Sequence, residues 1–435
     1  MKSIDKSYMY QLRLLWAYKD LLRNHFKPIT NWYIRKFRAA QLQAAHKLQG
    51  KDCLDVAFFL SIPGMWKHDT LFEAMQKDPH YHPYIVITLY SQYKGFEKDE
   101  MMKVLERTRQ FAESKGYEYV IPYDDKSGKW LDVKKLYHPD IVFFTAPYKD
   151  TLPQNFIYHY KDTLTCYLPY AITSLNYYKT NYNLISTNIV GIYFVETPIH
   201  KELAYKYSRN NAENVVVSGH PATEVFLNPN HSPHDEWKKQ SKPKKRVIYA
   251  PHHSIDFDNN ATFMDNGEAI LALAEKYSDD IQFAFKPHQL LKFKLQQVWG
   301  EEKTEDYYRR WESMENTQLV TDSYEDLFLT SDAMIHDCGS FTVEYIFTQK
   351  PVMYLCKDED MSDKFNPFGI KAFDCHYHGL SIDDIEHFLK DVVVEGNDPM
   401  KVQRKQFYDD YLASKDGVLP SQKMLQIIED TINGK

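Results

Sequence analysis

The sequence has few cysteines and no apolar stretch long enough to cross a membrane. Its five cysteines are odd in number and none is spaced as a CxxC pair, so neither a disulfide framework nor a zinc knuckle is expected. No run approaches the ~18 apolar residues of a membrane span. The first residues lack the apolar centre of a signal peptide. We therefore expect a cytoplasmic protein in a reducing environment.

Low-complexity tracts and internal repeats are also missing from the 435 residues. The apolar fraction of 43% and the charged fraction of 26% are those of an ordinary globular protein, which excludes a disordered chain. A chain of this length is longer than one hydrophobic core usually serves, so the sequence predicts two domains.

Positive charge is concentrated at the start of the chain. Residues 1–50 contain ten Lys or Arg and two Asp, whereas the whole chain has a net charge of −7. Aromatic residues and leucines are interleaved with these basic residues on predicted helices that break near Pro28. Such a basic amphipathic segment suits an anionic membrane surface, where each basic residue contributes about 1 kcal/mol. The alternative is a helical hairpin packed on the protein. Nucleic acid is not expected as a partner, because the basic residues do not continue along the chain.

Short apolar runs alternate with helical patterns along the rest of the chain. Residues 51–228 contain predicted strands at 55–62, 84–89, 119–121, 141–145, 165–168, 192–195 and 214–218. Residues 229–245 are rich in proline, asparagine and charge, which is typical of a linker. The alternation resumes over 246–400, and helices are expected over 401–435. This order predicts an α/β protein with two Rossmann-like, doubly wound parallel-sheet domains, the GT-B architecture, with ligands bound in a cleft between them.

The stretch from Ser331 to Leu355 has the pattern of half a nucleotide-binding βαβ unit. A short apolar strand is followed by a turn of small residues around Gly339 and then by a predicted helix over 341–348. The first turn of that helix would direct N–H groups and the positive end of its dipole at a phosphate or pyrophosphate. Glu344 would accept hydrogen bonds from ribose hydroxyls. The alternative is an ordinary α/β crossover without a ligand.

Two other predicted strands end in residues with useful chemistry. The strand over 247–250 is followed by Pro251, His252 and His253, and the strand over 281–285 by Lys286 and His288. Because the carboxyl ends of parallel strands meet at one edge of a sheet, these side chains are expected near Ser340. A lysine supplies fixed positive charge for phosphate, and a histidine can donate a proton, accept one or bind phosphate. The alternative for each histidine is an ordinary surface or core residue.

Residues 246–355 resemble the CDP-glycerol glycerophosphotransferases, which build teichoic-acid-like polyol phosphate polymers. Tyr249-Ala250-Pro251 is similar to the family's YAP strand end, Lys286-Pro287-His288 to its K-x-H-P or R-T-H element, and Lys350-Pro351 to its K/R-P element. Residues 331–344 resemble its S-D-x-x-I-T-D-Y-S-S-x-x-x-D block. Asp337, Ser340 and Glu344 occupy the Asp, Ser and acidic positions of that block.

The resemblance implies a transferase that moves glycerol phosphate or ribitol phosphate from a CDP-alditol to a hydroxyl of a glycan or polyol-phosphate acceptor and releases CMP. Such an enzyme would work on cell-surface polymers at the inner face of the membrane, with acceptors that include lipid-linked ones. No cofactor is implied, because the CDP-alditol is the donor substrate. Residue types leave two alternatives open: a GT-B glycosyltransferase that uses a UDP- or GDP-sugar, and a non-catalytic subunit that binds nucleotide sugars.

Roles for individual residues follow from the resemblance and from the chemistry of phosphoryl transfer. His288 would bind or protonate the leaving phosphate, and His253 is the alternative base facing the acceptor. The predicted donor-binding residues are Pro251, His252, Lys286, Asp337, Gly339, Ser340, Phe341 and Glu344. Asp256 and Asp258 have the D-x-D spacing of metal-dependent glycosyltransferases, but they follow the histidine loop in a different context, so no metal is expected.

The acceptor side of the site is less well defined by the sequence. The family's W-H-G-T-P element, whose histidine is the usual candidate for the general base, has only the histidine-free segment Tyr167–Ala171 as its nearest counterpart. Gly219–Pro221 resembles the family's turn before the domain connection and is expected to be a structural turn. Trp66, His68 and Asp69 follow the first strand and are candidates for contact with a polyol or sugar acceptor. Helix capping and packing are the alternative for these three residues.

Overall fold

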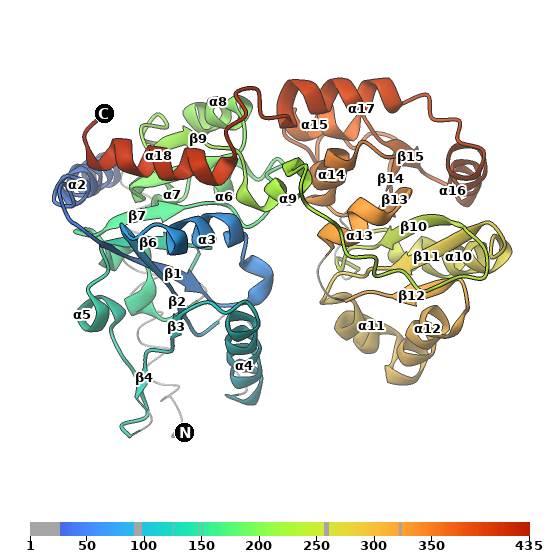
Figure 1. The fold of residues 1–435 in the computed structure, drawn as a ribbon, viewed down its shortest axis with the longest axis horizontal. Coiled ribbons are helices and arrows are strands. Elements are labelled where there is room, and N and C mark those ends of the chain that lie inside the picture. Colours follow the sequence, from blue (N-terminus) through green and yellow to red (C-terminus); the bar gives the residue numbers. More distant parts are fainter. Residues whose placement is uncertain are drawn as a thin grey trace. The chain divides into compact units, whose positions relative to one another are not determined.

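The computed structural model describes residues 27–90, 98–124, 126–146, 148–149, 151–255, 261–321 and 324–435. The chain divides into two compact units. The first consists of residues up to Ala171, Tyr177–Ala222 and Asp416–Lys435, and the second of Ile172–Asn176 and Thr223–Lys415. Each unit is built on one large parallel sheet covered by helices (Figure 1).

The sheet of the first unit has seven parallel strands in the order β3-β2-β1-β6-β7-β8-β9. The strands are β1 (Leu54–Leu60), β2 (Tyr81–Ile87), β3 (Tyr119–Val120), β6 (Ile141–Phe144), β7 (Leu164–Tyr167), β8 (Ile192–Val195) and β9 (Val215–Val217). Most strand residues are buried on both faces, which is why short continuous apolar runs predicted them correctly. The order reverses at β1, which pairs with β2 on one side and β6 on the other. Such a switch point is where open α/β sheets bind ligands.

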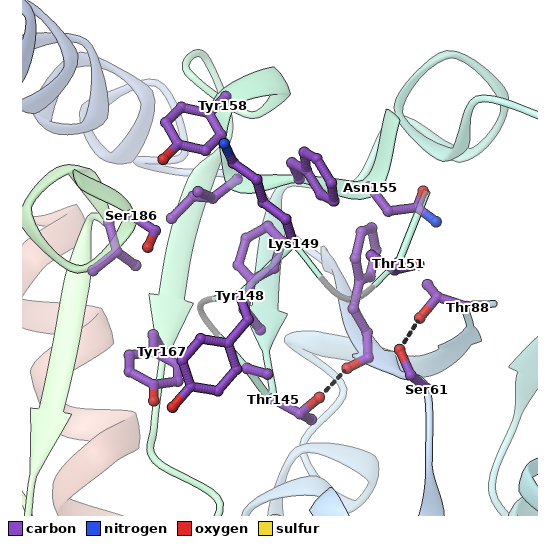
Figure 2. A pocket seen from close by; sticks show the side chains of 16 residues that line it. Ser61, Thr88, Thr145, Tyr148, Lys149, Thr151, Asn155, Tyr158, Tyr167 and Ser186 are labelled. Carbon is purple, nitrogen blue, oxygen red and sulfur yellow. Dashed lines mark hydrogen bonds between the residues drawn. The ribbon is translucent and has the colours of Figure 1, made fainter. Parts of the chain in front are cut away.

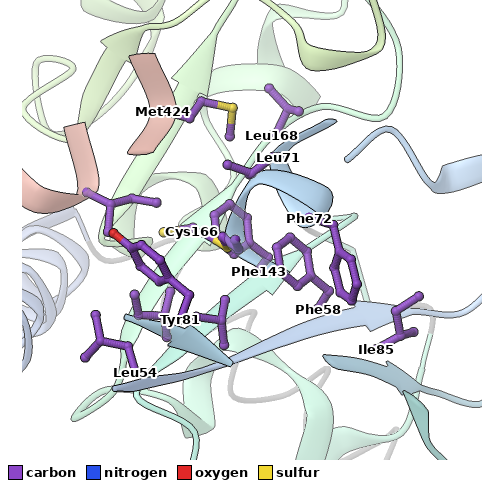
Figure 3. Close-up of a cluster of buried hydrophobic side chains, with 14 of the residues drawn as sticks. Leu54, Phe58, Leu71, Phe72, Tyr81, Ile85, Phe143, Cys166, Leu168 and Met424 are labelled. Atoms are coloured by element: carbon purple, nitrogen blue, oxygen red, sulfur yellow. The ribbon is translucent and has the colours of Figure 1, made fainter. Parts of the chain in front are cut away.

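Helices and short turns complete the first unit. They are α2 (Lys27–His46), η1 (Pro63–Met65), α3 (Asp69–Lys77), α4 (Lys98–Ser114), α5 (Val133–Tyr137), η2 (Pro153–Asn155), η3 (Ile157–His159), α6 (Tyr178–Tyr182), α7 (Ile185–Ile189), α8 (Pro198–Tyr207) and α18 (Pro420–Ile432), with the small hairpin β4 (Tyr123–Asp124) and β5 (Lys129–Trp130). Helix α18 buries Met424 in the same core as Phe58, Leu71 and Leu168, as Figure 3 shows. The end of the chain is therefore part of the first unit's core.

Helix α2 contains the part of the basic N-terminal segment that the structure describes. Pro28 lies in the first turn of this helix, where proline is tolerated. Ile34 and Phe37 are buried, and the Arg38 guanidinium donates hydrogen bonds to the carbonyls of Val190 and Gly191 at 3.0 and 2.7 Å. From residue 27 onward these contacts agree with the packed alternative, whereas the predicted membrane contact of residues 1–26 lies outside the described residues. Within the described part of the chain, no helix is long and apolar enough to span a bilayer.

The sheet of the second unit has six parallel strands in the order β12-β11-β10-β13-β14-β15. The strands are β10 (Lys245–Ala250), β11 (Ile281–Phe285), β12 (Thr317–Leu319), β13 (Ala333–His336), β14 (Val352–Leu355) and β15 (Tyr377–Gly379). The order reverses at β10, which pairs with β11 and β13. The prediction of two doubly wound parallel sheets is therefore confirmed.

The helices of the second unit include one that differs from its expected form. They are α9 (Glu224–Leu227), α10 (Phe263–Lys276), α11 (Leu291–Trp299), α12 (Glu301–Ser313), α13 (Glu325–Thr330), α14 (Phe341–Glu344), α15 (Pro367–Phe373), α16 (Ile382–His387) and α17 (Lys401–Phe407). Gly300, with φ +84°, separates α11 from α12. The helix expected over 341–348 is an α-helix for its first four residues only and continues as a 3-10 turn, Tyr345–Thr348.

The segment expected to link the domains packs on the second unit. Trp237 is buried there, and its indole N–H donates a hydrogen bond of 3.0 Å to the Thr330 hydroxyl. The Lys238 ammonium donates to the carbonyl of Met314 at 2.9 Å. The composition of this segment indicates that it lacks regular secondary structure. The contacts of Trp237 and Lys238 nevertheless anchor it to the second unit.

Candidate functional site

Three histidines meet at the switch point of the second sheet. His252 and His253 follow β10, and His288 follows β11. The ring centroids are 4.3 Å apart for the 252–253 pair, 5.2 Å for 252–288 and 4.1 Å for 253–288. One ring nitrogen from each residue lies within 4.8 Å of the other two. The structure thus brings together the three histidines that the sequence placed at this edge.

Burial sets the charge state of this cluster. It lowers the pKa of His252 and of His288 to about 3, and repulsion from the neighbouring imidazoles adds to the effect. His288 Nδ1 accepts a hydrogen bond of 3.1 Å from the backbone N–H of Leu290, so the proton of the neutral ring is on Nε2. At neutral pH His288 therefore offers an N–H donor, which suits hydrogen bonding to an anionic oxygen.

Asp337 holds the loop that carries the first two histidines. Its Oδ1 accepts a hydrogen bond of 2.6 Å from the backbone N–H of His252, and its Oδ2 accepts from the Thr262 N–H and hydroxyl at 2.7 and 3.1 Å. Burial raises the pKa of this carboxyl to about 6, and the hydrogen bonds from the loop oppose that rise. Asp337, predicted to bind the donor, is a positioning residue by these contacts. Asp256 and Asp258, between the two anchor points, lie outside the described residues.

A lysine adds positive charge beside the histidines. Lys286 directly follows β11 and is 9% exposed, and its backbone N–H donates a hydrogen bond of 2.8 Å to the carbonyl of Tyr249. Burial is the main cause of the lowered pKa of His288, and the charge on Lys286 contributes to it. Burial raises the pKa of Cys338, and Lys286 opposes that change. The lysine is therefore close enough to influence both the histidine cluster and the turn after β13.

The turn after β13 is held by Ile172–Asn176, the short segment that belongs to the second unit. The Ser174 hydroxyl donates a hydrogen bond of 2.7 Å to the carbonyl of Gly339. A Cβ at Gly339 would lie 3.0 Å from Cδ1 of Leu175, a tight contact that glycine avoids. The α-helical part beyond Ser340 is only four residues long, which makes its dipole a weaker phosphate attractor than the sequence suggested.

Two further predicted donor residues on α14 make contacts within the protein. The ring of Phe341 packs against Tyr324 and Phe328 with centroid separations of 5.1 and 5.0 Å. Glu344 is 5% exposed and accepts a hydrogen bond from the Tyr324 hydroxyl. These contacts anchor α14 to the core, and a direct role in ribose binding stays a prediction for Glu344.

The predicted acceptor residues of the first unit are packed in or against its core. His68 is fully buried between Phe58, Trp66 and Phe143, and burial lowers its pKa to about 3. The Trp66 indole N–H donates to Asp69 at 3.0 Å. These are the contacts of the packing alternative, and none of them presents His68 to a ligand.

The turn at Gly219–Pro221 is also explained by packing. Gly219 has φ +78°, a left-handed conformation that favours glycine. Nε2 of the buried His220 lies 2.9 Å from the carbonyl of Pro169, so it donates a hydrogen bond to the segment nearest in sequence to the missing W-H-G-T-P element. This contact agrees with the expected structural turn.

A pocket at the switch point of the first sheet was not predicted from the sequence. Ser61, Thr88 and Thr145 line it, and each directly follows a strand, namely β1, β2 and β6. Tyr148, Lys149, Thr151 and residues 155–158, all from the segment after β6, also line it (Figure 2). The signal in the sequence was a serine or threonine immediately after each of three strands. These side chains carry no charge and belong to no motif.

Comparisons with known proteins agree with the fold. A family model described as CDP-Glycerol:Poly(glycerophosphate) glycerophosphotransferase matches residues 171–430. No curated protein matches the chain. A histidine-to-asparagine variant of the wall teichoic acid polymerase TagF has 15% sequence identity and a TM-score of 0.57, with 99% of each chain covered. The same variant soaked with CDPG gives 15% identity and 0.55, covering 93% of this chain and 96% of that one.

A second group of solved structures shares the architecture. The S. aureus MnaA structure with UDP has 14% identity and a TM-score of 0.58, covering 87% of this chain and 97% of MnaA. At such low identity the structural matches establish the fold, which is GT-B-like.

Proposed function

Because the chain belongs to the CDP-glycerol:poly(glycerophosphate) glycerophosphotransferase family, we propose that it transfers a polyol phosphate from a CDP-alditol to a hydroxyl of a glycan or polyol-phosphate acceptor and releases CMP. The family assignment makes it a transferase of the teichoic-acid polymerase type. CDP-glycerol is the first donor to test, since a TagF structure of similar fold was obtained with CDPG.

The histidine cluster with Lys286 carries this proposal. In the reaction the acceptor oxygen forms a bond to the β-phosphorus while the bond between that phosphorus and the CMP oxygen breaks. Such a transfer depends on positioning and on neutralising phosphate charge rather than on covalent catalysis by the protein. Lys286 supplies positive charge, and His288 supplies an N–H donor at the switch point where α/β sheets bind nucleotides.

The charge state of His288 favours one of its two predicted roles. A ring whose pKa is about 3 is neutral before the donor binds, so it stabilises the leaving phosphate by hydrogen bonding rather than by giving up a proton. CMP leaves without needing that proton, because a phosphate monoester has a second pKa of about 6. The proton of the acceptor hydroxyl goes to a base, for which His253 is our candidate.

Nucleotide release distinguishes this function from the alternatives. The purified chain is incubated with radiolabelled CDP-glycerol, CDP-ribitol and a panel of UDP- and GDP-sugars, together with short polyol-phosphate acceptors. We expect CMP from one of the CDP-alditols. Release of UDP or GDP alone would assign the chain to sugar transfer, and binding of a nucleotide without any turnover would make it a binding subunit.

A further inference from the structure

The histidine cluster of the second unit, defined by His252, His253 and His288, has the composition of a transition-metal site. Each residue offers a ring nitrogen that lies within 4.8 Å of the other two. Among the residues that the structure describes, no other three His, Cys, Asp or Glu side chains bring ligand atoms this close together. All three histidines are partly exposed, so an ion can reach them from solvent.

The backbone around the cluster is held in place before any ligand binds. The N–H of His288 donates a hydrogen bond of 3.1 Å to the carbonyl of Pro251, which ties the segment after β11 to the segment after β10. The N–H of Ile255 donates to the carbonyl of His253 at 2.8 Å. Ligand residues on a fixed backbone lose little freedom when they bind, which favours a metal site.

Three imidazole nitrogens and one water are the ligands of an open zinc site. Zinc–nitrogen bonds of about 2.0–2.1 Å at tetrahedral angles place the three nitrogens about 3.4 Å apart. The ion would therefore draw the ring nitrogens together from their present separations of up to 4.8 Å. Rotation of the histidine side chains supplies this movement, and the backbone hydrogen bonds stay in place.

The outer contacts of the rings differ between His252 and His288. Nδ1 of His252 lies 2.9 Å from the Ser254 hydroxyl, so with a metal on Nε2 the Nδ1–H would donate to that hydroxyl. Nδ1 of His288 accepts from the Leu290 N–H. A metal on Nε2 of His288 would move the ring proton to Nδ1, and the Leu290 N–H would lose its acceptor. The metal-bound ring and the ring that offers an Nε2–H donor are therefore alternative states.

The surroundings of the cluster select the kind of metal. Besides burial and the neighbouring imidazoles, the charges of Lys294 and Lys286 lower the pKa of His288, so both ammonium groups lie near it. Both carboxylate oxygens of Asp337 accept hydrogen bonds from the loop. Mg²⁺ and Ca²⁺ require oxygen ligands, which the three histidines lack, whereas imidazole nitrogens suit Zn²⁺, Cu²⁺ and Ni²⁺.

We propose that the histidine cluster binds one Zn²⁺ ion and that the bound ion blocks the nucleotide donor. The ion takes the imidazole lone pairs and with them the N–H that His288 offers to phosphate. Zn²⁺ is then an inhibitor of the chain and not a cofactor. Metal binding depends on the three imidazoles alone, whereas the blocking of the donor rests on the proposed function.

Metal titration of the full-length chain, without a histidine tag and without donor, tests the site. Calorimetry measures Zn²⁺ binding, and Co²⁺ serves as a probe whose visible absorption reports nitrogen coordination. We expect one Zn²⁺ per chain, which displaces Co²⁺, and no displacement of Co²⁺ by millimolar Mg²⁺. Absence of Zn²⁺ binding, or displacement of Co²⁺ by Mg²⁺, would overturn the proposal.

Variants locate the ion. Loss of an outer partner of a metal ligand already costs 10–100-fold in metal affinity, so His252→Ala, His253→Ala and His288→Ala should each weaken Zn²⁺ binding about 100-fold or more. The matched control is His387→Ala, at an exposed histidine on α16 of the same unit, with unchanged affinity expected. Urea unfolding shows that each variant is folded. Unchanged Zn²⁺ affinity in any of the three cluster variants would overturn the three-histidine site.

Donor binding in the presence of Zn²⁺ tests the blocking. Because a diphosphate itself binds Zn²⁺, free Zn²⁺ is buffered at ten times its Kd for the chain. Mass action then weakens the binding of a CDP-alditol about tenfold. CMP release should fall with it, and a chelator should restore both. Unchanged donor affinity in the Zn²⁺-bound chain would overturn the blocking.

The two measurements also separate this proposal from the proposed function. Zn²⁺ binding in a chain that neither binds a CDP-alditol nor releases CMP would leave the metal site standing, and would remove both the transferase reaction and the blocking. CMP release in a chain that does not bind Zn²⁺ would keep the transferase reaction and remove the metal site.

Discussion

The two sheets reverse their strand order in the same way but present different chemistry at the point of reversal. Beyond β10 and its neighbours lie three imidazoles, a buried lysine and a buried carboxylate. Beyond β1 and its neighbours lie three hydroxyls, an amide and one lysine. One edge carries titratable and charged groups, and the other carries mostly uncharged polar side chains among aromatic ones. The topology fixes where a ligand is bound, and the residues after each strand decide which ligand it is.

Removing His288 is expected to have the largest effect. His288→Ala deletes the N–H donor proposed for the leaving phosphate, and loss of one such donor typically costs 10²–10³-fold in kcat, here measured as CMP release. The control is His387→Ala, at an exposed histidine on α16 of the same unit, with unchanged turnover expected. Full activity in His288→Ala would show that the histidine-bearing edge of the second sheet takes no part in the reaction.

The difference between the two edges also explains what the sequence could predict. Strands such as β6 and β14 are continuous apolar runs, and the Lys286-Pro287-His288 element after β11 shows a lysine and a histidine directly in the sequence. Ser61, Thr88 and Thr145 carry no charge and match no motif, so their convergence appears only when the strand order is known. Asn155 lies in a loop whose course depends on tertiary packing. The burial of His68 likewise depends on aromatic rings distant in sequence.

Substitution of His68 tests whether this histidine of the first unit takes part in the reaction, as the histidines of the second unit are proposed to do. Its folded-state pKa of about 3 lies below the unfolded value of about 6.5, so the unfolded state binds the proton first. Stability is complete above pH 6.5 and falls as the pH drops towards 3. His68→Leu should remove about 3 kcal/mol of the loss between pH 7 and pH 4, measured by urea unfolding.

The activity of this variant completes the test. Because His68 lies in the core, CMP release at neutral pH should not change in His68→Leu. A large loss of turnover in a variant of normal stability would return His68 to the acceptor site.

Substitution of Asp337 tests whether the histidine cluster beyond β10 depends on the hydrogen bonds to this carboxylate. Asp337→Asn keeps one acceptor for the loop but turns an NH₂ group towards a backbone N–H, which leaves a buried donor unsatisfied and should cost about 2 kcal/mol of folding free energy. The misplaced loop should also raise KM for the donor. Asp358→Asn, at an exposed carboxylate of the same unit, is the control for both measurements. A normal KM in Asp337→Asn would show that the histidines hold their positions without the carboxylate.

Substitution of Thr145 is expected to have the smallest effect. It also tests directly whether the edges of the two sheets differ in nucleotide binding. Thr145→Val keeps the side-chain shape and removes only the hydrogen bond to the Phe59 carbonyl, so unfolding in urea should show a loss of about 1 kcal/mol. CMP binding should be unchanged in calorimetry, because the residue lies in the unit that does not contain the histidine cluster. Weaker CMP binding in this variant would mean that the first edge also takes part in holding the nucleotide. The proposal that only the charged edge of the second sheet binds the nucleotide would then be wrong.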